Sequence, residues 1–377
     1  MADAVDGSDA GLRVVRVFHA AVVDAWRARD RALRAKGADV QLVTARRWNE
    51  GGAVVHLEAH GDEFVVSART FGSHPNAFVY DPRPIWRALR RHRPAIVDVC
   101  EEPCSLAAAE VMLLRRLACP GARVVLYSAQ NIFKRFPWPF RAFERAALRV
   151  AGGLYVCNQE AARILRHKGF EGTIAVVPLG VDLTSFSPCP GGGTERADGG
   201  LHLGYIGRLE HRKGLHVVLE AMRQEATWTL EVVGDGPDAD ELRLDSRRAG
   251  LEQRVRFSGF ADNADLPDLY RSFDVVVVPS LPTPTWEEQF CRVAVEAMAS
   301  GVPVVASASG ALPEVVGPGG RLFPPGDHQA LQQILCDLAG DPAARRELAG
   351  RAQEWARTFS WEVVADRHAD LYRAVLQ

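Results

Sequence analysis

Two glutamates in one segment are the strongest candidates for chemistry in this chain. The segment Thr285–Ala306 holds Glu288 and Glu296 with seven residues between them. From Phe290 to Ala299 nearly every position around a helical wheel is apolar, which predicts a buried helix. A buried carboxylate is costly unless a specific group meets it, so we expect Glu296 to have a partner.

The start of the same helix is suited to anions. The amides of Phe290, Cys291 and Arg292 are expected at its first turn, where unpaired N–H groups and the helix dipole attract negative charge. Residues 301–303 end the helix and lead into a strand, which is typical of an α/β domain. The alternative interpretation is a buried core helix that carries a stray glutamate.

Two cations form the second group of candidates. Gly207 lets the backbone turn sharply after a predicted strand, and Arg208 and Lys213 project from the loop that follows. Fixed cations of this kind suit an anionic ligand; a diphosphate leaving group, for example, needs neutralisation by a divalent metal or by protein cations. Arg208 and Lys213 could neutralise it without metal, and the alternative is an ordinary charged surface loop.

The elements that must position these residues follow a repeated α/β pattern, which predicts parallel βα units rather than hairpins. The predicted strands are Val14–Phe18, Val40–Thr44, Ala95–Val99, Arg123–Tyr127, Gly153–Cys157, Thr173–Val177, Leu201–Ile206, Trp228–Val233, Val255–Ser258, Val275–Val278 and Pro303–Ala306. The predicted helices are Trp26–Lys36, Pro84–Arg91, Ser105–Leu117, Pro139–Val150, Gln159–His167 and a last helix from about Trp361.

The pattern is interrupted once, which divides the chain. Residues 188–200 are rich in glycine and poor in apolar side chains, so we expect a flexible linker. A chain of 377 residues suits two domains of about 180 residues each. We therefore predict two doubly wound α/β domains, residues 1–187 and 201–358, that face each other across a cleft with the site at the carboxyl ends of the strands.

Composition limits the class of protein. Apolar content of 47% and charged content of 24% are those of a soluble globular chain, and no run reaches membrane-spanning length. No secretory signal pattern opens the sequence, so we expect a cytoplasmic protein. The seven cysteines are odd in number and include no CxxC, which argues against a disulfide framework or a zinc site.

Charge is divided unevenly between the halves. Residues 1–180 hold 26 Lys and Arg against 18 Asp and Glu, a balance of +8, which leaves 19 against 29, or −10, for the remainder. Two clusters, Arg83–Arg93 and Lys134–Arg149, interleave basic residues with Trp and Phe. They suit an anionic membrane surface or a phosphorylated acceptor. The alternative is a solvated helix face with its aromatic side buried, and we expect no nucleic-acid partner.

The segment around the two glutamates resembles the E-x7-E signature of the GT-B glycosyltransferases of family 4. That signature has phenylalanine and glycine after the first glutamate and EAMA-x-G-x-P-V after the second. The matching residues here are Glu288, Phe290, Glu296, Ala297, Met298, Ala299, Gly301, Pro303 and Val304. Cys291 stands where the family usually has glycine, so the approach of the backbone to a sugar phosphate is expected to be less free.

The resemblance implies a GT-B fold and a function. The family consists of retaining enzymes that move a sugar from a nucleotide-diphosphate-sugar donor to a hydroxyl acceptor, with no metal or other cofactor expected here. The resemblance further implies that residues 359–377 form a terminal helix that crosses back onto the first domain. The alternatives are a sugar-nucleotide epimerase or hydrolase, or a non-catalytic nucleotide-sugar sensor.

The resemblance also suggests roles for the donor side. Arg208 and Lys213 would grip the donor phosphates, Glu296 the ribose hydroxyls and Glu288 the transferred sugar. The remaining donor-binding candidates are Gly207, Gly234, Gly236, Phe260, Phe290, Cys291 and Arg292, and residues 309–314 would line the same side. Asp238 and Asp240 match a metal-binding D-x-D, but they fall in the first turn of a predicted helix, where the dipole alone favours carboxylates.

The acceptor side departs from the family at two loops. The chain lacks a Gly-Gly turn after the first strand, and instead has His19, Asp24 and Arg27, which could bind or deprotonate an acceptor hydroxyl or form a salt-linked loop. The family's histidine after the fourth major strand is replaced by Gln130 and Asn131, which could offer neutral hydrogen bonds or serve only a turn. We expect residues 101–102, both glutamates, to be a solvated charge pair, with an acceptor contact as the alternative.

Overall fold

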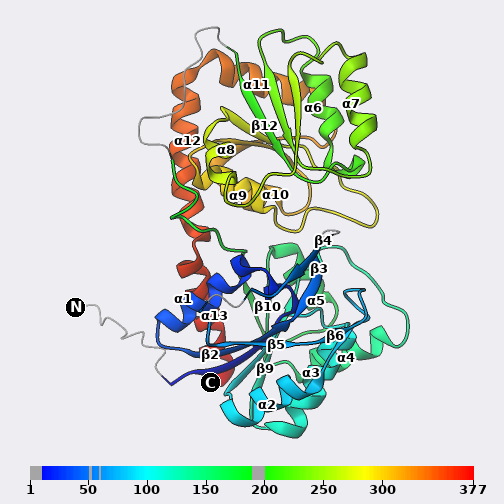
Figure 1. The fold of residues 1–377 in the computed structure, drawn as a ribbon, viewed down its shortest axis with the longest axis vertical. Coiled ribbons are helices and arrows are strands. Elements are labelled where there is room, and N and C mark those ends of the chain that lie inside the picture. The colour runs from blue at the N-terminus through cyan, green and yellow to red at the C-terminus, as the bar shows by residue number, and fades with distance from the viewer. Residues whose placement is uncertain (1–10, 51–52, 59–60, 189–199) are drawn as a thin grey trace, which may run out of the picture. The chain divides into compact units, whose positions relative to one another are not determined.

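The computed structural model describes residues 11–50, 53–58, 61–188 and 200–377. It divides into two compact units, Met1–Pro178 with Trp361–Gln377, and Leu179–Ser360 (Figure 1). Residues 179–187, expected in the first domain, therefore group with the second unit. The predicted linker 188–200 falls almost entirely outside the described residues.

The first unit is built on a seven-stranded parallel sheet in the order β11-β10-β9-β8-β1-β2-β5. Its strands are β1 (Arg13–Val17), β2 (Asp39–Ala45), β5 (Val65–Ala68), β8 (Ile96–Val99), β9 (Arg123–Ser128), β10 (Gly153–Val156) and β11 (Thr173–Val176). Its helices are α1 (Ala28–Ala35), α2 (Pro82–His92), α3 (Leu106–Ala118), α4 (Phe140–Val150), α5 (Gln159–His167) and α13 (Trp361–Leu376).

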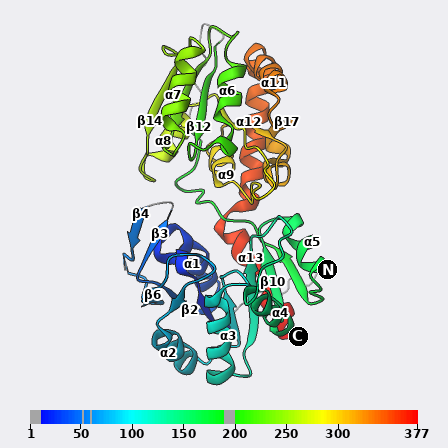
Figure 2. The ribbon, with the colours of Figure 1, turned by 90° about the vertical axis from the view of Figure 1, so that its right-hand side faces the viewer.

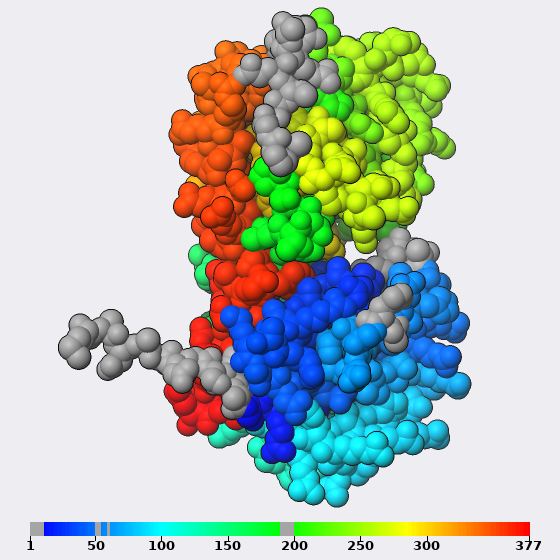
Figure 3. Space-filling model, turned by 60° about the vertical axis from the view of Figure 1, so that its left-hand side comes forward, coloured from blue at the N-terminus to red at the C-terminus, as the bar shows by residue number. Residues whose placement is uncertain are grey.

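Helices cover both faces of this sheet. Buried residues of α2, α3, α4 and α5 join one apolar cluster, and those of α1 and α13 join another. The helices α1 and α13 lie side by side, as the blue and red segments of the first unit show in Figures 1 and 3. The last helix begins at Trp361 and packs on the first unit, as expected.

Two small antiparallel hairpins were not predicted. They pair β3 (Arg47–Glu50) with β4 (Ala53–His56), and β6 (Thr70–Phe71) with β7 (Val79–Tyr80). Both lie beside the β2–β5 side of the sheet (Figure 2). Strands of two to four residues contain too few positions for an alternating pattern to stand out.

The second unit repeats the architecture with six parallel strands in the order β14-β13-β12-β15-β16-β17. Its strands are β12 (His202–Ile206), β13 (Thr229–Val233), β14 (Val255–Gly259), β15 (Val275–Val278), β16 (Val304–Ser307) and β17 (Gly320–Phe323). Its helices are α6 (Leu215–Ala221), α7 (Ala239–Arg248), α8 (Leu266–Arg271), α9 (Arg292–Ala299), α10 (Leu312–Val316), α11 (His328–Gly340) and α12 (Pro342–Ala356).

Both sheets reverse their strand order next to their first strand. In the first unit β1 lies between β2 and β8, and in the second β12 lies between β13 and β15. Loops after the strands diverge at such a switch point, which opens a crevice where ligands of doubly wound folds bind. The candidate residues of both units follow these strands.

Polar N-cap residues start two helices of the first unit. Ser105 caps α3 by accepting a hydrogen bond from the amide of Ala108 at 3.1 Å, and Asn158 caps α5 through the amide of Ala161 at 2.8 Å. Each side chain satisfies an amide that has no partner within its helix. These local signals explain why both helices begin within a residue of their predicted starts.

A buried ionic cluster fixes α13 to the sheet. Asp98 on β8 accepts hydrogen bonds from Arg29 at 2.8 Å, Tyr155 at 3.1 Å and Tyr372 at 2.6 Å. Arg29 also contacts Nε2 of His368, whose Nδ1 faces the carbonyl of Val364 at 2.9 Å. The carbonyl fixes the ring proton on Nδ1, so the imidazole is neutral and accepts from the guanidinium.

This histidine makes the protein sensitive to acid. Burial first, and then the Arg29 charge, lower the pKa of His368 well below its usual value. The unfolded chain therefore binds more protons below about pH 6.5, and stability is lost as the pH falls through that value. Between pH 7.5 and 5.5 we expect a loss of about 1 kcal/mol from this group.

Urea unfolding of the wild type and of His368→Gln at both pH values measures this loss. The glutamine variant keeps a hydrogen-bond acceptor for Arg29 but does not titrate. It should therefore show the smaller loss of stability, and equal losses would assign the acid sensitivity to another group.

Candidate functional site

The loops after β12, β13 and β14 converge in the second unit. The amide of Gly207 donates to Val233 O at 2.9 Å, and that of Gly234 donates to Gly259 O at 2.7 Å. A Cβ added to Gly234 would lie 1.9 Å from Gly207 O, so no larger residue fits there without a shift. The glycines predicted in separate motifs thus form one packed edge.

The other predicted loop residues differ in their exposure. A Cβ on Gly236 would lie 2.3 Å from the Leu209 carbonyl, which explains the second glycine of this turn. Phe260, in contrast, is 81% exposed, so its ring is available to a ligand rather than part of the core.

Lys213 and Glu288 meet although 75 residues separate them. Lys213 Nζ lies 2.7 Å from Glu288 Oε2, and the Ser280 hydroxyl donates to the same oxygen at 3.0 Å. The Lys213 ammonium also lies 4.8 Å from the centre of the Trp286 ring. Glu288 is only 8% exposed, so the ammonium compensates a largely desolvated carboxylate.

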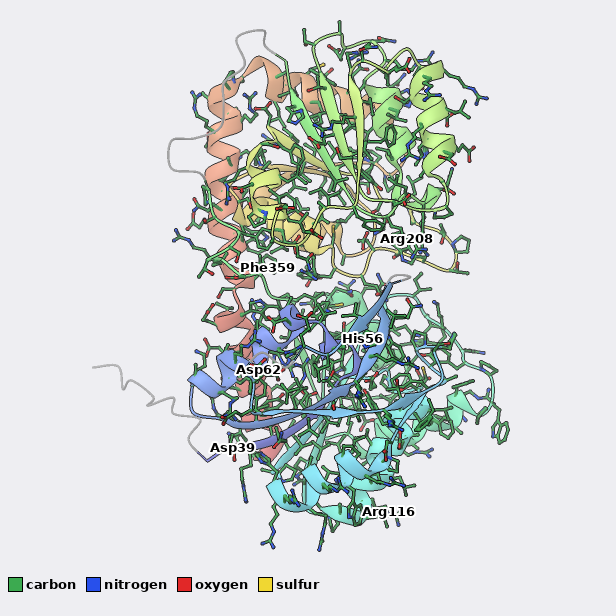
Figure 4. The ribbon with its side chains drawn as sticks, viewed as in Figure 1. Asp39, His56, Asp62, Arg116, Arg208 and Phe359 are labelled. Carbon is green, nitrogen blue, oxygen red and sulfur yellow. The ribbon has the colours of Figure 1, made fainter. Side chains whose placement is uncertain are left out.

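Arg208 projects from the same edge (Figure 4). Its side chain is 53% exposed and contacts Glu210 through Nε, and Arg212 pairs with the other Glu210 oxygen at 2.6 Å. The sequence predicted Arg208 to be a positive charge that projects from the loop, and nothing in it indicated Glu210 as a partner. The carboxylate orients Arg208 but also neutralises part of its charge.

Glu296 has the partners that its burial requires, and the protein supplies them. Its two oxygens accept from Tyr270 at 2.9 Å and from Arg292 at 2.8 Å. Burial first, and then the Glu296 carboxylate, raise the pKa of Tyr270 well above its usual value, so the phenol remains a donor. The expected ribose contact is thus not needed to satisfy Glu296, although Arg292 remains partly exposed.

The helix that carries Glu296 begins later than predicted. It starts at Arg292, while Cys291 precedes it with φ 79° and ψ 82°, and Phe290 is buried against Phe359 with ring centres 5.8 Å apart. A left-handed backbone costs a residue with a Cβ about 1–2 kcal/mol, and glycine adopts it freely. The position that departs from the family signature is therefore one whose geometry favours glycine.

Replacing Cys291 by glycine is expected to stabilise the second unit. The matched control is Cys291→Ala, which keeps the Cβ. We expect the glycine variant to be more stable than this control by about 1 kcal/mol, or to melt at a Tm roughly 2–4 °C higher in thermal unfolding. Equal melting temperatures for the two variants would show that the backbone is not strained.

Burial and then Glu288 raise the pKa of Cys291 to about 12, so the thiol is protonated at neutral pH in the wild type.

The segment after β16 closes the same edge. The amide of Ala311 donates to Glu288 O at 2.9 Å, and a Cβ on Gly310 would lie 2.3 Å from that oxygen.

Asp240 is exposed and pairs with Arg243 at 3.0 Å, within the first turn of α7. Among the described residues, no group of three or more His, Cys, Asp or Glu side chains is arranged to hold a metal ion.

His19 and Glu101 form the most distinctive pair in the first unit. His19 follows β1 and Glu101 follows β8, so both stand at the carboxyl edge of adjacent strands. His19 Nδ1 lies 2.7 Å from Glu101 Oε2, and the His19 amide donates to Oε1 at 2.9 Å. The carboxylate places the ring proton on Nδ1 and directs Nε2 as the basic nitrogen, as in a His–carboxylate dyad.

The pair of glutamates 101–102 was interpreted wrongly as solvated charges. Glu101 is buried and also accepts from Tyr80 at 2.6 Å. Glu102 accepts from Ser128 at 2.9 Å and from the amide of Ala129 at 2.8 Å. Burial raises the pKa of Glu102 above its usual value, while these hydrogen bonds lower it in part.

Arg27 and Asp24 belong to a salt-linked loop. Arg27 is fully buried and donates to the carbonyls of Ala21 at 2.9 Å, Val22 at 3.1 Å and Glu58 at 3.0 Å. Asp24 is exposed but pairs with Arg31 at 3.0 Å. An acceptor contact for Arg27 does not fit this burial, because its guanidinium holds backbone carbonyls inside the fold.

Gln130 and Asn131 lie where β9 ends, as predicted, but in different surroundings. Gln130 Oε1 accepts from Lys168, which also pairs with Glu144 at 2.5 Å. Asn131 is buried. These contacts fix the turn after β9, so they support the turn role that the sequence left open.

Two family models match this chain. One, described as Glycosyl transferases group 1, matches residues 194–355, and the other, described as Glycosyltransferase Family 4, matches residues 30–185. The chain belongs to the GT-B glycosyltransferases of family 4. The two matches together correspond to the two α/β units, and they include every donor-side candidate.

Curated relatives agree with this family. The chain is 34% identical over 241 residues to a D-inositol 3-phosphate glycosyltransferase from Streptomyces avermitilis, covering 58% of this chain and 51% of the relative. It is 30% identical over 251 residues to a 2-deoxystreptamine glucosyltransferase from Streptomyces kanamyceticus, covering 62% of this chain and 63% of the relative. The matched region thus spans half to two thirds of each relative's length.

Solved structures share the fold over nearly the whole chain. A sucrose-phosphate synthase from Thermosynechococcus elongatus has a TM-score of 0.71 at 23% identity, covering 96% of this chain and 98% of that chain. Anabaena HepE in complex with UDP and glucose has a TM-score of 0.70 at 21% identity, covering 96% of this chain and 99% of that chain. These likenesses establish the GT-B fold of the family-4 chain.

Proposed function

We propose that this family-4 protein is a retaining glycosyltransferase. It moves a sugar from a nucleotide-diphosphate-sugar to a hydroxyl group of a glycan, lipid-linked or natural-product acceptor. The contact between Lys213 and Glu288 carries this proposal, because it joins the cation loop and the E-x7-E segment at one edge of the second unit. A non-catalytic sensor would not need an ammonium held against a buried carboxylate beside a switch point.

The donor proposal starts from UDP-glucose. Anabaena HepE, which shares the fold, has been solved with UDP and with UDP-glucose. In this chain Lys213 and Arg208 would neutralise the departing diphosphate, Glu288 would meet the sugar hydroxyls and Glu296 the ribose. Preorganised charges of this kind stabilise a leaving group without reorganisation during the reaction.

The proposed chemistry depends on placement. The donor phosphate itself helps to take the proton of the acceptor hydroxyl, so the sugar is transferred with retention of configuration. Neither a protein nucleophile nor a metal is required in this scheme. His19, held by Glu101, would orient the acceptor hydroxyl through Nε2.

The deciding experiment follows the product of UDP-glucose with a panel of hydroxyl acceptors, with and without EDTA. We expect transfer in both conditions and an axial anomeric linkage, read from the coupling constant of the anomeric proton by NMR. Inverted product would overturn the retaining mechanism, and loss of transfer with EDTA would overturn the metal-free scheme. Epimerised or hydrolysed donor without transfer would favour the alternative enzyme classes.

We also propose a cytoplasmic enzyme that makes peripheral contact with an anionic membrane. Within residues 82–150 every acidic side chain is buried or half-buried, whereas Arg141, Arg145 and Arg149 are exposed. Trp138 is 81% exposed next to these cations. None of the described helices is long and apolar enough to cross a membrane. Sedimentation with anionic and with neutral vesicles tests the contact, and equal binding to both would contradict it.

A further inference from the structure

A basic cavity lies in the first unit, outside the donor site. It has a volume of about 510 Å³ and is lined by Arg46, Arg47, His56, Arg69, Thr70 and Phe71. Arg46 directly follows β2 and Arg69 directly follows β5, so both leave the carboxyl edge of the sheet. Arg47 and His56 are paired residues of the β3–β4 hairpin, and Figure 4 shows His56 far from Asp39, where β2 begins.

No described side chain supplies the cations of this cavity with a counter-charge. Among the side chains that the structure describes, no carboxylate forms an ion pair with Arg46, Arg47 or Arg69. A second cavity, of about 460 Å³ in the other unit, also contains arginines, but they are neutralised. There Arg223 pairs with Glu220 at 3.1 Å and Arg248 with Asp245 at 3.3 Å.

Three guanidinium groups that form no ion pair with a described side chain, together with an imidazole, specify the class of ligand. Like charges held together repel, and a multivalent anion removes the repulsion. A phosphate monoester carries nearly two charges and offers oxygens that match the planar fork of arginine. The volume suits a molecule of sugar-phosphate size, and the exposed Phe71 ring adds an apolar wall.

Residues close in sequence to the lining of the cavity contact the proposed acceptor site. The Thr44 hydroxyl, two residues before Arg46, donates to His19 O at 3.2 Å. Trp48, the residue after Arg47, packs on the His19 ring with centres 4.3 Å apart. The β6–β7 hairpin leads from Phe71 to Tyr80, which donates to Glu101. The same short segments therefore build the cavity and support the His19–Glu101 pair.

We propose that this cavity binds the phosphate group of a phosphorylated acceptor and presents its hydroxyl to His19. The inference rests on the proposed glycosyltransferase function and specifies its acceptor as a sugar or cyclitol monophosphate. The arginines select the phosphate, and the neighbouring His19–Glu101 pair selects the hydroxyl. The unphosphorylated parent compound would therefore bind much more weakly than the phosphorylated acceptor.

The test compares the double variant Arg47→Gln/Arg69→Gln with the wild type. In the transfer assay with hexose and cyclitol monophosphates and their unphosphorylated parents, the wild type should prefer the phosphorylated members. We expect the double variant to raise the KM for a phosphorylated acceptor by about 100-fold, roughly tenfold for each arginine. The donor KM, kcat and Tm should change little, because both side chains are exposed.

Arg116→Gln is the matched control. Arg116 is an exposed arginine on α3, and Figure 4 places it at the end of the first unit opposite His56. Its removal takes one positive charge from the unit, against two in the double variant, without touching the cavity. A similar rise in the acceptor KM in this control would show that the effect comes from the net charge of the unit, and it would overturn the proposal.

Titration with inorganic phosphate and with UDP at fixed ionic strength separates the remaining outcomes. Phosphate that competes with the acceptor, and binds more weakly to the double variant, supports the proposal. Phosphate that competes only with the donor would assign the cavity to the donor diphosphate and overturn it. The protein could also neither bind UDP nor transfer sugar, while phosphate binds the wild type and not the double variant. In that case the anion site would stand, and only the glycosyltransferase proposal would fail.

Discussion

Lys213→Ala is expected to lower kcat/KM for sugar transfer by about 1000-fold. Its ammonium lies 2.7 Å from Glu288 and is the cation that we assign to the departing diphosphate. Removing one preorganised group that stabilises developing charge costs about 100- to 1000-fold in other enzymes. The variant also leaves the largely buried Glu288 without its cation, which displaces the sugar contact. Initial rates with UDP-glucose, together with UDP affinity by calorimetry, measure the loss.

Arg212→Ala is the matched control for this variant. Arg212 lies 4.8 Å from the Trp286 ring, the same distance as Lys213, but it pairs with Glu210 rather than with Glu288. We expect its removal to change kcat/KM by less than about tenfold, because the half-buried ion pair that is lost does not include Glu288. A Lys213→Ala enzyme that turns over donor at the wild-type rate would refute the phosphate assignment.

The convergence of the donor-side candidates was predictable from sequence because parallel sheets bring the ends of distant strands to one edge. Lys213 follows β12 and Glu288 follows β15, and these strands are neighbours. Once the α/β alternation is recognised, the two motifs must converge. The structure adds the contact between them, which spacing alone could not specify.

The partners of these residues could not be predicted. Tyr270, which donates to Glu296, is a single tyrosine on the short helix α8, and nothing in its spacing marks it. Glu210 is one of many surface glutamates until the fold brings Arg208 and Arg212 to its two oxygens. Both pairings depend on tertiary packing, about which a single sequence contains little information.

The first unit was less predictable for the same reason. Glu101 was expected to be a solvated charge, and Arg27 to bind an acceptor or join a salt-linked loop, yet both are buried and hold other groups in place. The basic cavity depends on the β3–β4 hairpin and on β5, which were not predicted. The residues that we propose for acceptor recognition therefore emerge only from the structure.

Loss of the His19–Glu101 pair is expected to lower transfer by about 100-fold. His19→Ala removes the nitrogen assigned to orient the acceptor hydroxyl, and misplacing a reacting group by about 1 Å costs about 100-fold. Glu101→Gln keeps the size of the side chain but no longer imposes the Nδ1 tautomer, so we expect a smaller loss of about tenfold to 100-fold. Both effects should appear in the acceptor kinetics, while hydrolysis of the donor stays unchanged.

Glu102→Gln is the control, since it alters the adjacent carboxylate without touching His19. Its amide can still accept from Ala129 and contact Ser128, so transfer should remain within about threefold of the wild type. A merely structural role for His19 would instead lower the Tm and impair donor hydrolysis together with transfer. Equal losses in Glu101→Gln and Glu102→Gln would refute the dyad, because only Glu101 contacts the imidazole.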